Sequence, residues 1–100
     1  MPQLTIIATL IAKPGKSEAL GQALLALVPP SRAEEGCINY DLHHSLNDAN
    51  TWVVYENWVS KAALEYHFAT PHFQAFSKQL DDLTGGSVGL QELEMVSSKA

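Results

Sequence analysis

The chain has 100 residues, with six Lys and Arg against eleven Asp and Glu and a formal net charge of −5. This length fits one domain over residues 1–100, and the lack of a basic cluster argues against a nucleic-acid or anionic-membrane partner. The single cysteine excludes an internal disulfide, and no Cys/His spacing predicts a metal site. The N-terminus lacks the features of a signal peptide, and its apolar run is too short to span a bilayer, so we expect a cytoplasmic protein.

The first third of the chain predicts a strand followed by a helix. Residues 3–12 are rich in β-branched residues and end at Pro14-Gly15, which is typical of a strand closed by a turn. Apolar residues at helical spacing over 16–28 predict an amphipathic helix. We expect Pro29-Pro30 to interrupt this helix, because neither ring nitrogen can donate a backbone hydrogen bond. A further helical turn over 31–35 would then end at Gly36.

The middle of the chain predicts a β-hairpin and then a helix. Residues 37–45 and 51–58 alternate as strands, and the polar connection over 46–50 has the length of a hairpin loop. Ser60 is a good N-cap for a helix beginning at Lys61. Because the second strand alternates, its residues divide between two faces: Val53 and Tyr55 on one, and Trp52, Val54, Glu56 and Trp58 on the other.

The last third predicts a second helical piece and a fourth strand. Thr70-Pro71 resembles an N-cap followed by proline at the first helical position, so we expect the helix to restart there. We expect Gly85-Gly86 to end this piece and residues 88–96 to form the strand. The apolar stripe of the helical piece consists of Phe73, Phe76, Leu80 and Leu83.

The predicted order is β-α-β-β-α-β, which is the ferredoxin-like α+β arrangement with a four-stranded antiparallel sheet and both helices on one face. Residues 3–12 are apolar on both faces, whereas a strand with one buried face alternates more cleanly. Something must therefore cover the second face. We expect a homodimer in which two sheets face each other.

Three motifs over residues 34–73 carry a family resemblance: EEGCxxYD, YExWxSKxAL and HxxTPHF. Together they resemble the antibiotic biosynthesis monooxygenase domain family, most closely its quinol monooxygenase branch. The resemblance implies a dimeric α+β barrel with a pocket between the sheet and the helices of each subunit. Members of this family include oxygenases without a cofactor, haem-degrading enzymes and an isomerase of a phosphorylated sugar.

Two branches of the family use residues that this chain replaces. The haem-degrading branch uses Asn, Trp and His; Trp58 stands at the matching tryptophan, but Ile7 and Ser77 stand at about the other two positions. The polyketide-oxidising branch carries an Asn and a Tyr, where this chain has Val54 and Leu64. The resemblance therefore favours quinol oxidation over these two mechanisms.

A cofactor-free oxygenase needs an apolar pocket, a base for the acidic proton of its substrate and donors for the resulting oxyanion. Histidine suits the role of base, because its unperturbed pKa of about 6.5 lies near working pH. We predict His67 or His72 as the base. His67 can equally be a buried histidine that bonds to backbone or to Glu56, and His72 can bond to solvent.

We predict that the substrate contacts Trp58, Tyr55, Phe73, Asn39 and Glu56. Each of these residues also has a structural interpretation: core packing for the aromatic residues, and a hydrogen bond or ion pair for Glu56. The alternative for Glu56 is to orient His67 as the base, and of the two we prefer the structural role. We interpret Cys37 as a packing residue, because its neighbour Glu35 does not favour a thiolate.

The sequence thus predicts a cofactor-independent monooxygenase that oxidises a quinol or related phenolic or polyketide substrate with O₂. One alternative is an isomerase of a small phosphorylated sugar, whose phosphate would need Arg32, Lys61 or Lys78. Another alternative is a dimeric module that binds a small ligand without turnover.

Overall fold

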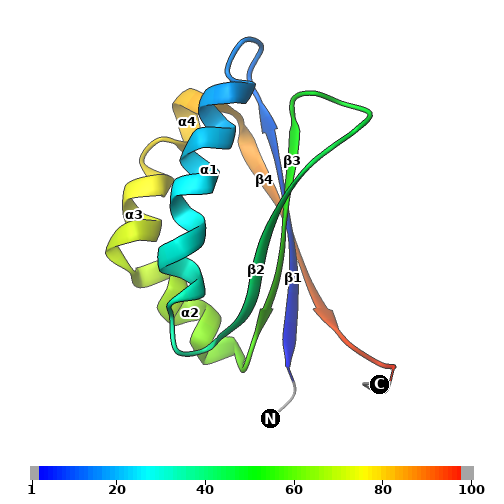
Figure 1. The fold of residues 1–100 in the computed structure, drawn as a ribbon, viewed down its shortest axis with the longest axis vertical. Helices are drawn as coiled ribbons and strands as arrows, with labels where there is room; N and C mark the ends of the chain where they lie inside the picture. Colours follow the sequence, from blue (N-terminus) through cyan, green and yellow to red (C-terminus); the bar gives the residue numbers. More distant parts are fainter. Residues whose placement is uncertain (1–2, 98–100) are drawn as a thin grey trace.

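The computed structural model describes residues 3–97, except for the side chains of residues 86 and 87. The elements follow the predicted β-α-β-β-α-β order, with the second helical region divided into three helices (Figure 1). They are β1 (Leu4–Ala12), α1 (Ser17–Arg32), β2 (Cys37–His44), β3 (Thr51–Trp58), α2 (Lys61–Ala69), α3 (Pro71–Ser77), α4 (Leu80–Leu83) and β4 (Thr84–Glu94).

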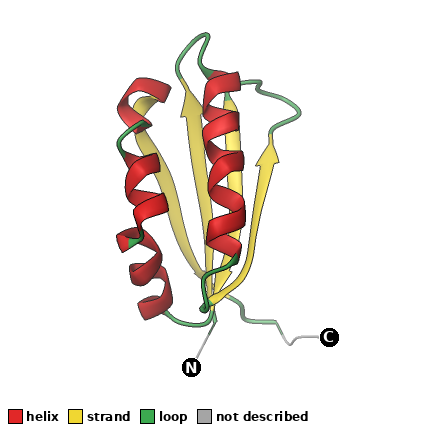
Figure 2. Cartoon of the chain, turned by 60° about the vertical axis from the view of Figure 1, so that its left-hand side comes forward, coloured by secondary structure: helices red, strands yellow, loops and turns green. Residues whose placement is uncertain are grey.

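The four strands form one antiparallel sheet in the order β2-β3-β1-β4. All of the helices lie against the same face of this sheet (Figure 2). This is the predicted ferredoxin-like α+β fold, so the prediction of the fold class is confirmed. In the described part of the chain, no helix is long and apolar enough to cross a membrane.

The core lies between the sheet and the helices. On β1, Ile6, Ala8 and Leu10 are almost completely buried, and their partners on β3 are Glu56, Val54 and Trp52. Alternation along each strand brings these side chains to the helix-covered face, as the pattern of 51–58 predicts. From the helices, Leu20, Leu24 and Leu64 pack against them.

Helix α1 runs through Pro29 and Pro30 to Arg32, so the prediction that the two prolines interrupt it was wrong. The prolines remove the backbone hydrogen bonds that would end on the carbonyls of Leu25 and Ala26. Both of these residues are exposed, so water can satisfy the carbonyls. The helix continues because Ala33 donates a backbone hydrogen bond of 3.1 Å to Pro29.

The second helical region breaks where the sequence predicts. Ser60 and Thr70 both act as N-caps, accepting from the backbone N–H groups of Ala63 and Phe73. Phe76 and Leu83 are buried as expected, but a further break at Lys78-Gln79 separates α3 from α4. Strand β4 begins directly after α4 at Thr84, so Gly85 belongs to the strand rather than to a loop before it.

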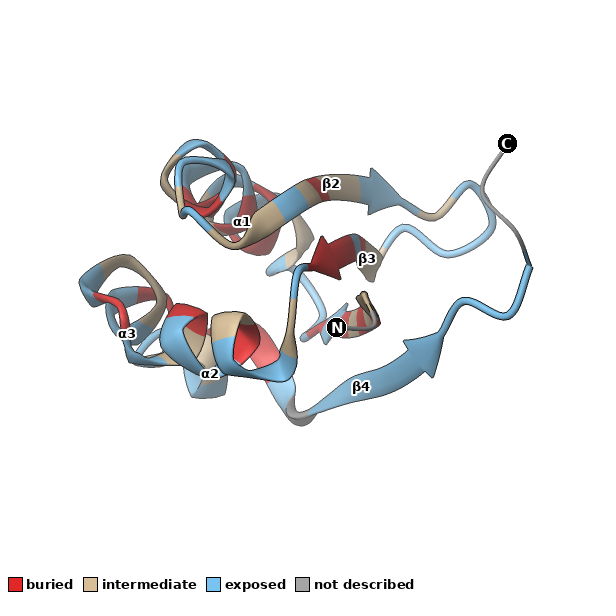
Figure 3. Ribbon diagram, turned by 90° about the horizontal axis from the view of Figure 1, so that it is seen from below, coloured by how far each residue is buried: buried red, intermediate tan, exposed pale blue. Residues whose placement is uncertain are grey.

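No helix of residues 3–97 lies against the other face of the sheet, and β4 is exposed along most of its length (Figure 3). Apolar side chains on this open face include Ile11 and Tyr55, which are 53% and 37% exposed, and Leu93. The open face also carries a chain of hydrogen bonds, in which Asn57 accepts from Thr5 and donates to Asn39.

Gly36 allows the turn after α1 to pass close to α2. A Cβ at this position would collide with the Cβ of Ala63 and lie 3.3 Å from Val59 Cγ2. The turn therefore requires glycine because of the close approach of α2. This contact fixes the position of the neighbouring residue Glu34 relative to α2.

We predict that Gly36→Ala lowers the free energy of unfolding by about 1–3 kcal/mol, because the added methyl group must push α2 away from the turn. Gly85→Ala is the matched control, since a Cβ there meets nothing within 4 Å. Urea unfolding followed by circular dichroism measures both. Equal stability of the two variants would contradict the close approach at Gly36.

Candidate active site

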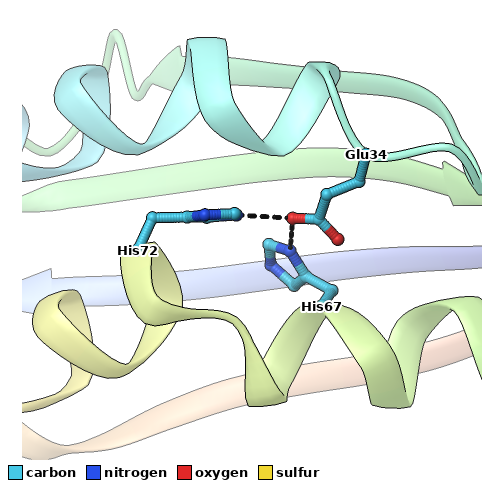
Figure 4. Close-up of side chains that lie close together, drawn as sticks. All are labelled: Glu34, His67 and His72. Atoms are coloured by element: carbon cyan, nitrogen blue, oxygen red, sulfur yellow. Dashed lines mark hydrogen bonds and ion pairs between the residues drawn. The ribbon is translucent and has the colours of Figure 1, made fainter.

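The site centres on Glu34, which lies in the turn between α1 and β2. One oxygen of its carboxylate, Oε2, lies 2.7 Å from His67 Nδ1 and 2.6 Å from His72 Nε2 (Figure 4). His67 belongs to α2 and His72 to the first turn of α3. Three separate segments of the chain therefore meet at one oxygen atom.

The break between α2 and α3 brings both imidazoles to this carboxylate. Thr70 ends α2, with its Oγ1 donating to the backbone carbonyl of His67 at 2.7 Å. The same hydroxyl oxygen then accepts from Phe73 N and starts α3, with Pro71 at the first helical position. His67 and His72 consequently approach Glu34 from two different helix directions (Figure 4).

The shared oxygen defines where the imidazole protons lie. An ionised carboxylate oxygen only accepts, so with Glu34 ionised both His67 Nδ1 and His72 Nε2 carry a hydrogen and donate. A neutral His67 then keeps its lone pair on Nε2. Within the described residues, this nitrogen makes no hydrogen bond, so it is available to a ligand.

A cavity of about 230 Å³ lies next to His67, between the sheet and the helices. Apart from the phenol of Tyr40, the imidazole of His67 and the carboxyl group of Glu56, its wall is apolar. The lining residues are Ala8, Leu10, Leu24, Tyr40, Val54, Glu56, His67, Phe68, Phe73, Phe76, Leu80, Val88 and Leu90. An apolar cavity of about 150 Å³ already binds benzene, so this one is large enough for a substituted aromatic ring.

Burial shifts the pKa of two titratable groups on the cavity wall, His67 and Glu56, away from their ordinary values. Burial lowers the pKa of His67, and the neighbouring Glu34 opposes part of this effect. The His67 side chain is only 1% exposed, so the neutral imidazole is favoured near neutral pH. The pKa of Glu56 is raised to about 7. Burial is the main cause, and the hydrogen bond that Glu56 accepts from Trp58 Nε1 at 2.9 Å opposes part of the rise.

An open cleft of about 810 Å³ lies on the other side of the cluster and includes Glu34 and His72 in its wall. His72 is 25% exposed, whereas Glu34 is 5% exposed. The cluster therefore lies between an apolar cavity, bordered by His67, and an open cleft, bordered by His72. Within the described residues, Glu34, His67 and His72 are also the group whose atoms could hold a metal ion.

The structure brings four of the predicted site residues to one region. His67, Phe73 and Glu56 line the cavity, and His72 lines the neighbouring cleft. Trp58 is completely buried with its ring 4.7 Å from that of His67, but it is not part of the cavity wall. The Trp58 ring packs against the imidazole of His67.

Tyr55 and Asn39 are not brought to this region, because strand alternation places them on the open face of the sheet. Tyr55 pairs with Ile7 and Asp41 across the neighbouring strands, and all three point away from the helices. Asn39 accepts a hydrogen bond of 2.9 Å from Asn57 and donates one to Asp41. Neither side chain can reach a ligand in the cavity beside His67.

Glu34 is the residue of the site that the sequence analysis missed. The motif that carries the family resemblance begins with Glu34 and Glu35, and the pattern does not distinguish them. In the structure Glu35 is exposed and Glu34 is turned inward to the two histidines. Of the two alternatives for Glu56, the structure shows the structural one: Glu56 accepts a hydrogen bond from Trp58, and it is Glu34 that bonds to His67.

The fold and the site define a small α+β protein with a histidine–carboxylate cluster beside an apolar cavity. Residues 3–79 match the family model described as "Antibiotic biosynthesis monooxygenase", and the chain belongs to this family. The family predicted from the three motifs is thereby confirmed.

Individual relatives agree with this assignment. The solved structure of PA3566 from Pseudomonas aeruginosa is 43% identical, covers 97% of both chains and superposes with a TM-score of 0.92. The Escherichia coli (strain K12) protein named "Probable quinol monooxygenase YgiN" is 32% identical over 75% of this chain and 82% of its own. The chain is 34% identical over 80% of its length to "Uncharacterized protein sll1783" of Synechocystis, of which it spans about half, 54%.

The raised pKa of Glu56 makes stability depend on pH. The folded chain binds a proton at Glu56 up to about pH 7, whereas the unfolded chain releases it near the ordinary value of 4.5. The wild-type protein therefore loses roughly 3 kcal/mol of stability at this residue as the pH rises through that window. His67 acts in the opposite direction, because its pKa is lowered.

We predict that Glu56→Gln removes this loss and keeps an acceptor for Trp58. The free energy of unfolding of the variant, relative to wild type, should rise between about pH 5 and pH 8. Urea titrations across this range measure the difference, in which the contribution of His67 cancels. Parallel pH profiles of the two proteins would show that Glu56 has an ordinary pKa.

Proposed function

We propose that the protein is a cofactor-independent monooxygenase that oxidises a quinol or related phenolic substrate with O₂, and that His67 is the base. The observation that carries the proposal is that His67 borders an apolar cavity while its Nδ1 is held by Glu34. The free Nε2 can then accept the proton of a phenolic hydroxyl group bound in the cavity. The family and the name of the E. coli relative support this class of reaction.

The proposed reaction combines one quinol and one O₂ to give one hydroxyquinone and one water. His67 Nε2 takes a hydroxyl proton, and the resulting phenolate passes one electron to O₂. The two radicals then join through a new C–O bond. His67 returns its proton to the terminal peroxide oxygen. The ring carbon that carries the peroxide then loses its hydrogen as a proton and becomes a carbonyl as the O–O bond breaks, and this second proton leaves with the departing hydroxide as water.

The remaining site residues have supporting roles in this proposal. Phe73 provides a wall against which an aromatic ring can pack, and the Trp58 ring packs against the His67 imidazole. With a pKa of about 7, Glu56 is partly protonated at neutral pH and can donate a hydrogen bond to a substrate oxygen. His72 is less well placed as the base, because it lies at the cleft; it holds Glu34 in place.

We also propose that the protein acts as a homodimer through the open face of the sheet. This face exposes Ile11, Tyr55 and Leu93 on neighbouring strands. Exposed apolar side chains on a sheet face that no described helix covers are characteristic of protein interfaces. Tyr55 belongs to this surface and thereby has a role in assembly rather than in substrate binding.

The sugar-phosphate isomerase has less support. Arg32 donates to the Asp41 carboxylate at 2.9 Å and Lys61 to Glu92 at 3.1 Å, and neither these two cations nor Lys78 lines the cavity. A phosphate in the cavity would therefore have no cationic partner among its wall residues. A binding module without turnover would give a ligand-dependent rise in the melting temperature, with the ligand recovered unchanged.

We predict that the protein consumes O₂ with hydroquinones above the rate of autoxidation, measured with an oxygen electrode. His67→Gln should lower kcat by about 10²–10⁴, because the proton acceptor is lost. His43→Gln is the matched control, since His43 is exposed on β2 and, among the described residues, its ring bonds to the Asp41 backbone carbonyl alone.

Circular dichroism of both variants establishes that they are folded. An unchanged rate in folded His67→Gln, or no enzymatic uptake across a broad panel of quinols, would refute the proposed reaction. Recovery of an unchanged, stabilising ligand would instead favour the binding module.

For the dimer, we predict that light scattering gives twice the 10.9 kDa mass of the chain. Ile11→Glu should shift the equilibrium toward monomer, because it places a charge on the open face. Leu25→Glu is the control: Leu25 is 54% exposed, close to the 53% of Ile11, but it lies on α1. A monomeric wild-type protein, or equal effects of the two variants, would contradict the proposed interface.

A further inference from the structure

We propose that Glu34, His67 and His72 form a binding site for a late first-row divalent cation, for which Zn²⁺ is the natural probe. The ligands would be the Glu34 carboxylate, His67 Nδ1 and His72 Nε2, whose donor atoms lie within 4.8 Å of one another. Two imidazoles and one carboxylate are a common set of protein ligands for zinc and iron. In the described part of the chain this is the group with that composition.

The arrangement needs only small movements to hold an ion. Ligand atoms at about 2.0–2.2 Å from zinc are separated by roughly 3.0–3.5 Å. The two N···O distances of 2.7 and 2.6 Å must therefore open slightly, and the imidazoles must turn toward the ion. His72 has room to turn, because it is 25% exposed in the first turn of a short helix.

A second observation, on the other oxygen of Glu34, also points to a bound cation. Glu34 Oε1, the other carboxylate oxygen, is buried and makes no hydrogen bond to the described residues. The whole side chain is only 5% exposed. A buried carboxylate oxygen without a partner is energetically costly, and a cation bound beside it would remove that cost.

The ion would have a route to the site and a free coordination position. Glu34 and His72 form part of the wall of the open cleft, so the cation can enter from solvent without passing through the apolar cavity. Three protein ligands leave a fourth position of a tetrahedral zinc, which water from the cleft can occupy.

Metal binding at this place would inhibit the reaction proposed above, a consequence that rests on the proposed function. A neutral imidazole coordinated through Nδ1 carries its hydrogen on Nε2. His67 would then present a donor instead of an acceptor to the cavity, and it could not remove a proton from a phenol. The cation is therefore an inhibitor that acts on the His67 tautomer, whereas the metal-free protein is the active form.

The test is titration of the chelator-treated full-length protein with Co²⁺, followed by its visible absorption, and competition with Zn²⁺. We expect one cation per chain and a higher melting temperature with Zn²⁺. His72→Gln and Glu34→Gln should each weaken binding at least about tenfold, because each removes a ligand. His43→Gln and Glu35→Gln are the matched controls, with an exposed histidine and the neighbouring exposed carboxylate, and should bind as wild type does.

No binding, or the same loss in the controls as in the ligand variants, would overturn the site and identify any bound ion as adventitious. Oxygen uptake provides a separate readout. Inhibition by Zn²⁺ at the concentrations that saturate the site supports the tautomer mechanism, whereas full uptake by the zinc-loaded protein overturns it. A metal-free protein that consumes no O₂ refutes the proposed function but leaves the binding measurement intact.

Discussion

Two imidazole N–H groups converge on one carboxylate oxygen, and the functional region depends on this interaction. Glu34 is buried at a cost in free energy, which hydrogen bonds from His67 and His72 offset. These two bonds connect the turn after α1 to α2 and α3. The close approach at Gly36 and the helix break at Thr70-Pro71 are the local features that make the three segments meet.

This interaction places a single histidine between two different environments. On one side of His67 lies a cavity with phenylalanine and aliphatic walls, and on the other side lies the carboxylate that holds its ring. Burial favours the neutral imidazole, while Glu34 fixes which nitrogen keeps the hydrogen. The base proposed here and the cation site are therefore alternative uses of the same ring, one through Nε2 and the other through Nδ1.

Most of the fold could be predicted from the sequence, because it depends on periodicity and on capping residues. Alternation in 51–58 correctly put Glu56 on the helix-covered face, and that same alternation already separated Tyr55 from the pocket. The continuity of α1 through Pro29-Pro30 was not predicted, because proline spacing alone does not show that the residues one turn earlier, Leu25 and Ala26, are exposed. Glu34 was missed for a related reason: two adjacent glutamates look alike until a turn buries one of them.

The most direct test of the account is nitrogen NMR of the histidines in the metal-free protein near neutral pH. Long-range correlations between ring carbon-bound hydrogens and ring nitrogens report which nitrogen carries the hydrogen. The account predicts that His67 is neutral, with its hydrogen on Nδ1 and the lone pair on Nε2. A hydrogen on Nε2 of a neutral His67, or a His67 that is fully charged at this pH, would contradict it.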